Sequence, residues 1–417
     1  MKFGKRTNET IDTLTKKLGF DVRFYGKSFS FYSISYATTV LRGIASTYLV
    51  TLWVAPEILG QFRYVLAIYA LAGMFSFGGY GTSMIKGLAR GESDIVKKSI
   101  KKIFLYAPLG SLILILSAID RFTHQEQNVG IAMLVAAIAF VPYSACAFYN
   151  QIYIGLEKIK KLTVVSVWSD VLYAILFTLV LLKTHNLAII TLAYFLIDIV
   201  IQGWFTWRAY RSIPSTSTRA INDSAMPLGK HLNWIYVIQG ITGSLGLILL
   251  QRFWGYTTLA AFSVAMLLPE QCISLAKTMS GTILQRLSRH DAGGTKVKNI
   301  QKQFWHALIA SIAIILAYAA VAPFILPILF PKYPDAVLPS IAYSLGILAL
   351  PSIIGINYFL SIKNIKKYWL FSNVTSFLQF VTSVVLIPWF GNWGAIWSRV
   401  TTRLGALPFS YPVEEKK

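Results

Sequence analysis

The sequence contains few charged residues, and this scarcity excludes several classes of protein. Charged residues make up 13% of the 417 residues, whereas a typical soluble domain contains about 25%. The apolar share is 55%, and the mean hydropathy is +0.57. Together these values exclude a soluble enzyme, a disordered protein and a disulfide scaffold. They indicate an all-α polytopic membrane protein.

Cysteine and histidine are also scarce, and neither is arranged for chemistry. The two cysteines, Cys146 and Cys272, lie inside long apolar segments. The five histidines are scattered without the spacing of metal ligands. We therefore expect no disulfide, no metal site, no cofactor and no catalytic residue.

Long apolar segments dominate the chain instead. A helix that spans a bilayer needs about 20 apolar residues. Charged and turn-forming residues separate twelve segments of roughly this length, at 28–52, 62–85, 103–119, 130–152, 163–183, 187–207, 231–251, 256–278, 304–329, 337–361, 367–389 and 392–411. These unbroken apolar runs exclude a transmembrane β-barrel. The last segment contains two arginines, and its alternative interpretation as an interfacial hairpin would leave eleven spans.

The net charge of +22 mostly reports how the chain is oriented. Of the 39 lysines and arginines, 29 lie in the N-terminal tail and in the loops on the same side of the predicted membrane. Only Arg121, Lys183, Arg252 and Lys332 lie in the loops on the other side. Because basic loops stay in the cytoplasm, we expect both termini to be cytoplasmic. The basic charge therefore does not indicate nucleic-acid binding.

The longest interior loop divides the predicted spans six and six. The expected parts are a cytoplasmic N-terminal tail at 1–27, a six-helix bundle at 28–207, a cytoplasmic linker at 208–230 and a second six-helix bundle at 231–417. In the tail, Ile11, Leu14 and Leu18 have helical spacing among basic residues. This spacing fits either a frayed tail or a helix lying on the inner leaflet, and both remain open.

Short motifs recur in the same order in the two halves. Leu59-Gly60-Gln61-Phe62 matches Leu259-Ala260-Ala261-Phe262, Arg90-Gly91-Glu92 matches Arg289-His290-Asp291, and Ile159-Lys160-Lys161 matches Ile365-Lys366-Lys367. Since six spans is an even number, both halves enter the membrane in the same direction. The pattern predicts two parallel repeats with a substrate site between them, which is the architecture of an alternating-access transporter.

Four cations in or beside the predicted spans are candidates for binding an anion. Arg42 lies roughly 21 Å along its helix from the inner end, too deep to reach the cytoplasm. Arg399 and Arg403 lie one turn apart in the last span, and Lys277 lies at the end of the eighth. A guanidinium donates paired hydrogen bonds to phosphate. We therefore expect a cationic central cavity that binds a phosphate-bearing substrate.

Three carboxylates also lie within the predicted spans. Asp170, Asp198 and Glu270 could bind a coupling proton or cation, because ionisable groups in a membrane usually face a cavity. Alternatively, these groups pair with neighbouring residues and fix the packing of the helices. The sequence does not choose between the two interpretations or among the three residues.

Five short motifs resemble those of a known family. They are Pro56–Phe62, Gly78–Gly81, Gly155–Lys158, Phe330–Ala336 and Gly391–Ile396, each at the end or start of a predicted span. In order and position they are similar to the oligosaccharide flippase (polysaccharide biosynthesis and export) family, of the O-antigen flippase type. That family belongs to the multidrug/oligosaccharidyl-lipid/polysaccharide superfamily. One departure is Gln251-Arg252, where many members have an acidic residue.

The resemblance implies a fold and a function. The implied fold is two six-helix bundles, and the implied function is the movement of an undecaprenyl-diphosphate-linked oligosaccharide across the bacterial inner (plasma) membrane. It further implies membrane lipid around the substrate, a proton or cation as a candidate coupling ion, and a polysaccharide polymerase as a candidate partner. A flippase of this kind is not an enzyme and needs no catalytic side chain.

Two other functions compete with this prediction. A multidrug extruder of the same superfamily would need carboxylates to dominate its cavity, and here arginine is in excess. A membrane polysaccharide polymerase or ligase would need a large outer loop, whereas the longest one here, near 120–129, has about ten residues. We therefore expect a flippase before an extruder, and an extruder before an enzyme.

Overall fold

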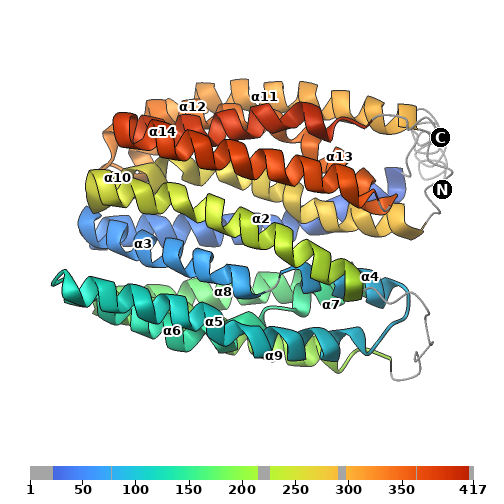
Figure 1. Ribbon diagram of the computed structural model, residues 1–417, viewed down its shortest axis with the longest axis horizontal. Coiled ribbons are helices and arrows are strands. Elements are labelled where there is room, and N and C mark those ends of the chain that lie inside the picture. The colour runs from blue at the N-terminus through green and yellow to red at the C-terminus, as the bar shows by residue number, and fades with distance from the viewer. Residues whose placement is uncertain (1–21, 77, 215–225, 290–296, 363, 413–417) are drawn as a thin grey trace, which may run out of the picture.

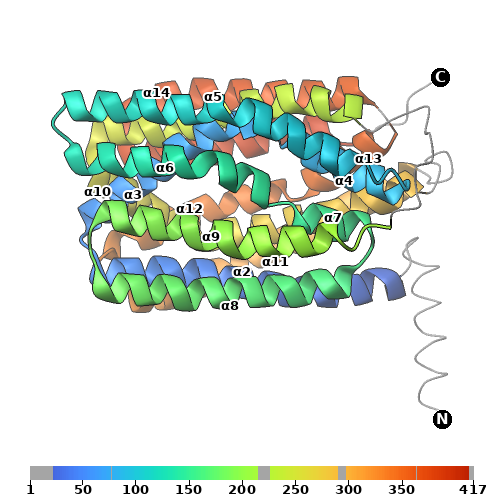
Figure 2. The same cartoon turned by 90° about the horizontal axis from the view of Figure 1, so that it is seen from below.

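The described residues form a bundle of long helices that lie side by side along one axis (Figures 1 and 2). The computed structural model describes residues 22–76, 78–214, 226–289, 297–362 and 364–412. Within these ranges every regular element is an α-helix or a 3-10 helix, which confirms the predicted all-α class. The positions Ile11, Leu14 and Leu18 lie outside the described residues, so both interpretations of the tail remain open.

The elements fall in the order that the apolar segments predict. In the first half they are α2 (Val22–Trp53), α3 (Pro56–Ala72), η1 (Gly73–Ser76), α4 (Gly79–Ala89), α5 (Ile95–Thr123), α6 (Gln127–Cys146), α7 (Tyr149–Gly155), α8 (Ile159–Lys183) and α9 (Leu187–Tyr210). In the second half they are α10 (Met226–Arg289), α11 (Val297–Leu329), η3 (Pro334–Ala336), α12 (Val337–Ser344), η4 (Leu345–Ala349), α13 (Pro351–Ser361), α14 (Ile365–Ala406) and η5 (Leu407–Ser410).

Nine helical stretches among the described residues are long and apolar enough to cross a membrane. Two of them, Asn233–Ser274 and Lys366–Ser410, each contain two of the predicted spans. Helix α2 is not among the nine, although it covers the first predicted span. The chain is thus a multi-pass membrane protein, and the count of twelve crossings in two bundles stays a prediction.

Glycines form the two turns that join those paired spans. Gly255 has φ 80° and ψ 178°, and Gly391 has φ 54° and ψ −123°. Both values lie where a side chain is strained, so glycine allows the helix to turn within one residue. A Cβ at Gly391 would also lie 2.8 Å from the Trp254 ring. Figure 1 shows α10 and α14 each doubling back along the bundle at these turns.

Turns at one end of the bundle fall at corresponding positions in the two halves. In the first half, turns fall at 54–55, 124–126 and 184–186. In the second half, turns fall at Gly255, at 330–333 and at Gly391, each about 200 residues after its counterpart. Two parallel repeats would produce this spacing, which supports that prediction.

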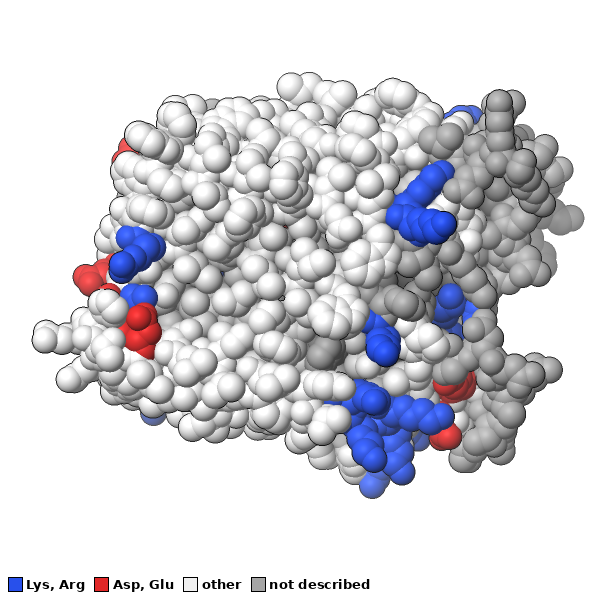
Figure 3. Space-filling model, viewed as in Figure 1, with Lys and Arg blue, Asp and Glu red and all other residues white. Residues whose placement is uncertain are grey.

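The two ends of the bundle differ in charge. We call the end with the exposed Lys97, Lys98, Lys101, Lys102 and Arg208 the basic end, and the end with the six turns above the opposite end. Figure 3 shows a broad uncharged band between them on this face. Large apolar side chains are exposed on the helices, among them Leu105, Leu116, Ile138, Phe324 and Trp389. Such a surface suits lipid hydrocarbon rather than water.

Helix α10 holds the two halves together. It packs against α14 within its own half, and against α3 and α4 of the first half. In the first half, α2 packs against α8, and α6 packs against α5 and α9. These neighbours decide which polar side chains can meet.

Candidate functional site

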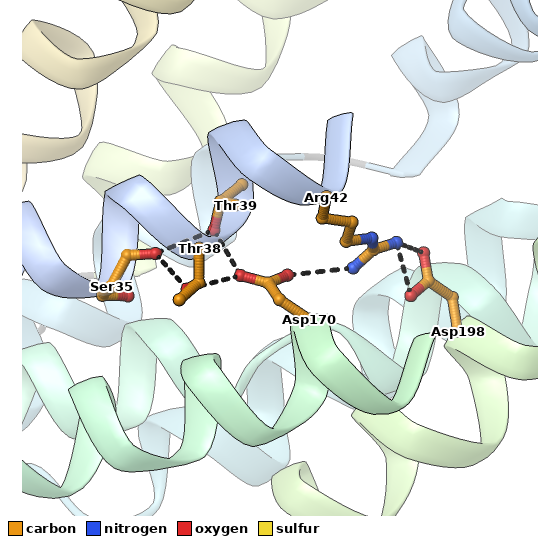
Figure 4. Close-up of polar contacts among 6 residues, drawn as sticks. All are labelled: Ser35, Thr38, Thr39, Arg42, Asp170 and Asp198. Carbon is orange, nitrogen blue, oxygen red and sulfur yellow. Dashed lines mark hydrogen bonds and ion pairs between the residues drawn. The ribbon is translucent and has the colours of Figure 1, made fainter. Parts of the chain in front are cut away.

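The first polar cluster joins three helices of the first half, and we call it the first-half network. Arg42 on α2 lies 3.3 Å from Asp170 on α8 and 2.8 Å from Asp198 on α9 (Figure 4). Thr38 and Thr39, also on α2, donate to the same Asp170 oxygen at 3.1 and 2.7 Å. A single cation is therefore shared by two carboxylates.

Aromatic rings pack against one part of the network. The Arg42 guanidinium lies 3.5 Å from the centre of the Tyr173 ring, a cation–π contact. Tyr173 stacks on Phe177, and Tyr194 meets both rings edge-on. Asp198 is 2% exposed. Because a buried charge is costly unless it is paired, this pairing fixes α2 to α8 and α9.

The second polar cluster lines a cavity of about 540 Å³, which we call the second-half cavity. Its walls come from α10, η4, α13 and α14, with Thr82 and Ile85 of α4 on the side of the first half. Several of its residues lie near helix ends at the basic end, among them Tyr236, Leu360 and Tyr368. None of the described residues at the six opposite-end turns lines it.

Arg403 is the arginine of this cavity that pairs with a carboxylate. Its Nη2 atom lies 2.7 Å from Glu270, which also accepts a hydrogen bond of 2.8 Å from the Tyr343 hydroxyl. Its Nη1 atom is buried and has no hydrogen-bond partner among the described residues. A Cβ at Gly346 would lie 3.1 Å from that atom, so the glycine makes room for the guanidinium. The Nη1 donor of Arg403 is therefore unsatisfied among the described residues in this conformation.

Arg399 lies one turn before Arg403 and is held differently. Its Nη2 atom donates to the backbone oxygen of Gly243 at 3.1 Å. Within the described ranges, no carboxylate pairs with it. A guanidinium has five N–H donors, so one carbonyl leaves most of them for a ligand.

Amide side chains complete the polar wall of the cavity. Gln239 donates to Ser372 at 3.0 Å, Gln379 donates to Ser398 at 3.1 Å, and Asn357 donates to the Ile353 carbonyl at 2.8 Å. Gln239 and Asn357 were not predicted as site residues. Their signal in the sequence is an amide inside an otherwise apolar span, which is common in helix packing and therefore weak.

The structure does not bring the predicted arginines together in one central cavity. Arg399 and Arg403 line the second-half cavity, whereas Arg42 lies in the first-half network. Carboxylates pair with Arg42 and Arg403, so among the three predicted arginines only Arg399 has no carboxylate partner in the described ranges. The side chain of Lys277 lies outside the described residues. Arg42 is separate from Arg399 and Arg403 because α2 packs against α8, whereas α14 packs against α10.

Solved structures with this fold are transporters. An outward-facing multidrug resistance MATE family transporter of the MOP superfamily has a TM-score of 0.68, with 15% identity over 92% of both chains. Lipid II flippase MurJ, in an inward closed conformation, has a TM-score of 0.68 and 13% identity over 91% of this chain and 86% of that chain. A MOP superfamily transporter from Pyrococcus furiosus has a TM-score of 0.68 and 13% identity over 92% of this chain and 93% of that chain. The reverse polarity of its binding pocket suggests a different function for that protein.

At these identities the likeness establishes the fold and nothing finer. The chain has the fold of MOP superfamily transporters, and the three structures named are transporters or flippases rather than enzymes. No family model matches the chain. No curated protein matches it either.

Proposed function

We propose that the chain is a flippase that moves an undecaprenyl-diphosphate-linked oligosaccharide across the bacterial inner membrane by alternating access. The observation that carries this proposal is the arginine pair of the second-half cavity. Among the described lining residues, Arg399 and Arg403 are the only charged ones. A diphosphate presents several anionic oxygens, which match guanidinium donors that have no protein acceptor.

The remaining wall of the cavity suits a sugar. Sugar hydroxyl groups donate and accept hydrogen bonds, and the side chains of Gln239, Asn357 and Gln379 can do both. A volume of about 540 Å³ is in the range of pockets that hold small organic ligands. The lipid tail stays in the bilayer, beside the exposed apolar helix faces.

The first-half network is the proposed coupling site. Its two carboxylates, Asp170 and Asp198, exceed its one guanidinium, so the network has room for one further positive charge, a proton or a cation. Glu270 is the third candidate, and its bond to Arg403 would connect ion binding directly to the second-half cavity. The basic end is cytoplasmic in this proposal, as the distribution of lysine and arginine favours.

A multidrug extruder is the second candidate. The fold it shares with MATE transporters and the carboxylates of the first-half network favour this function. The arginine-lined cavity favours an anionic substrate instead, since it would repel the cationic drugs of a typical extruder. The O-antigen type of sugar and a polymerase partner belong to the flippase proposal.

The test is leaflet-specific detection of lipid-linked oligosaccharide in cells that depend on this protein. Arg399→Gln should lower the rate of appearance in the outer leaflet at least tenfold, because a hydrogen bond to a charged group contributes about 1.5–3 kcal/mol. Arg399→Lys should be intermediate, because it keeps the charge and loses the paired donors. Arg399 is the cleaner position, since removing Arg403 would also break its ion pair with Glu270.

The matched control is Arg211→Gln, an exposed arginine at the basic end that stacks on Trp207 at 3.8 Å. It should flip substrate at the parental rate. Normal flipping by Arg399→Gln at equal expression would exclude the arginine cavity as the substrate site. If the lipid-linked oligosaccharide appeared in the outer leaflet at the normal rate in cells without the protein, the proposed flippase function would be excluded.

A further inference from the structure

A hydrogen bond joins the two halves of the molecule at the opposite end. The hydroxyl of Tyr256, the residue after the Gly255 turn of α10, donates to Glu126 at 2.5 Å. Glu126 directly precedes α6 of the first half. Arg121 at the end of α5 lies 3.2 Å from the same oxygen of Glu126 and 2.9 Å from Asp120, so the acceptor is held in place by a cation.

Helices α3 and α10 pack closely around this hydrogen bond. The Tyr256 ring meets Tyr64 of α3 edge-on at 5.8 Å, and the Arg121 guanidinium lies 5.1 Å from the Tyr64 ring. A Cβ at Gly60 would lie 2.0 Å from the Tyr256 carbonyl oxygen. Only glycine therefore allows α3 and α10 to approach this closely, and the contact closes the space between the halves.

A second hollow lies beside this contact and is separate from the second-half cavity. It has a volume of about 380 Å³, and its lining includes Glu57, Gln61, Glu126 and Tyr256. No described residue lines both it and the second-half cavity. The two halves pack here through α3 and α10. Opening this end between the halves would separate these helices and pull the Tyr256 hydroxyl away from Glu126.

We propose that Tyr64, Arg121, Glu126 and Tyr256 form a latch that holds the opposite end closed. The latch rests on the alternating access of the proposed function, but not on the identity of the substrate. Tyr256 and Glu126 supply the bond that breaks on opening. Arg121 positions Glu126, and Tyr64 supports both Arg121 and Tyr256. Loss of the bond shifts the population of molecules toward the open state.

The experiment measures access to the cavity without any substrate. A reporter, Thr242→Cys in the cavity wall, is placed in a background of Cys146→Ala and Cys272→Ser. A membrane-impermeant maleimide is applied from the side of the membrane that the opposite end faces. This side is identified as the one from which a cysteine replacing His185, in an opposite-end turn, is labelled. Tyr256→Phe and Glu126→Ala should each increase the labelling rate about fivefold, the population shift expected from losing one hydrogen bond. The labelling rate of the double variant should be no higher than that of either single variant, because both changes remove the same hydrogen bond.

Tyr318→Phe is the matched control. It removes a hydroxyl contact of the same length, 2.5 Å to Ser340, but this contact lies within the second half. Its labelling rate should equal that of the parent. An equal increase in Tyr318→Phe, or no increase in both latch variants, would overturn the latch. Because no flipping is measured, the latch can fail while the flippase stands, and the reverse also holds.

Discussion

Arg42 shows how a single partly buried cation depends on partners from two other helices. Arg42→Met would leave Asp170 and Asp198 facing each other without a cation in an apolar surrounding. Removing one partner of a buried ion pair costs about 3–5 kcal/mol. The variant should therefore unfold at a clearly lower temperature in detergent. Asp198→Asn should be better tolerated, because one cation then still faces one anion.

Arg211→Met, at an exposed position, controls for the loss of an arginine as such. Its unfolding temperature should stay close to that of the parent. If Asp198→Asn were less stable than Arg42→Met, the charge balance would not explain the stability of the network, and hydrogen bonding to Asp198 alone would be the stronger contribution.

Charged site residues were predictable at the residue scale, and their partners were not. Asp170, Asp198 and Arg42 stand out because charge is rare in an apolar span. Thr39 and Arg42 are three residues apart, so a helix places them on one face. The face does not reveal which helix lies opposite it, so the sequence could not separate Arg42 from Arg399. The uncharged Gln239 and Asn357 were missed for the reason that amides commonly fill helix contacts.

At the scale of elements, hydrophobic length predicted where helices lie but not where they break. The segment 62–85 is divided between α3, η1 and α4, and the segment 130–152 between α6 and α7. No charged residue marks either break. The glycines at 73, 78 and 79 and the proline at 142 lie close to them, but such residues also occur inside unbroken helices, as Pro108 does in α5. The reversals at Gly255 and Gly391, by contrast, fall where the sequence separates neighbouring predicted spans, although the helical assignment continues through both turns.

The turn at Gly255 gives a prediction at the scale of elements. Its φ of 80° and ψ of 178° lie in a region that is almost exclusively occupied by glycine, and other residues pay about 1–3 kcal/mol there. A methyl group added at this position would meet no neighbouring atom of the described residues within 4 Å, so the cost of Gly255→Ala is purely conformational. The variant should unfold at a lower temperature, as measured by the loss of monodisperse protein on heating.

Gly73→Ala provides the comparison for that measurement. Gly73 also has open space around it, but its φ of −55° and ψ of −17° suit alanine. It should leave the unfolding temperature unchanged or raise it slightly, because alanine is less flexible in the unfolded chain. Equal losses in both variants would show that any added methyl group harms the protein, and the argument from backbone geometry would fail.

For the whole molecule, the proposals above assign three tasks to three separate regions. The first-half network lies among α2, α8 and α9, the second-half cavity lies mainly among α10, α13 and α14, and the latch lies where α3 meets α10. Helix α10 is the element that touches both the cavity and the latch. If the proposed ion and substrate sites are both correct, they lie in separate halves and influence each other only when the halves move, which is what alternating access requires.

The orientation of the molecule in the membrane is the last prediction. If the basic end is cytoplasmic, a cysteine that replaces exposed Lys98 should react with an impermeant maleimide only after the cells are permeabilised. A cysteine that replaces exposed His185, at the opposite end, should react in intact cells. Both are tested with Cys146 and Cys272 replaced, and His185→Ser and Lys98→Ser give the background labelling. The reverse pattern would place the basic end outside. The second-half cavity would then lie toward the outer leaflet in this conformation, and loading of substrate from the cytoplasm would have to begin at the latch.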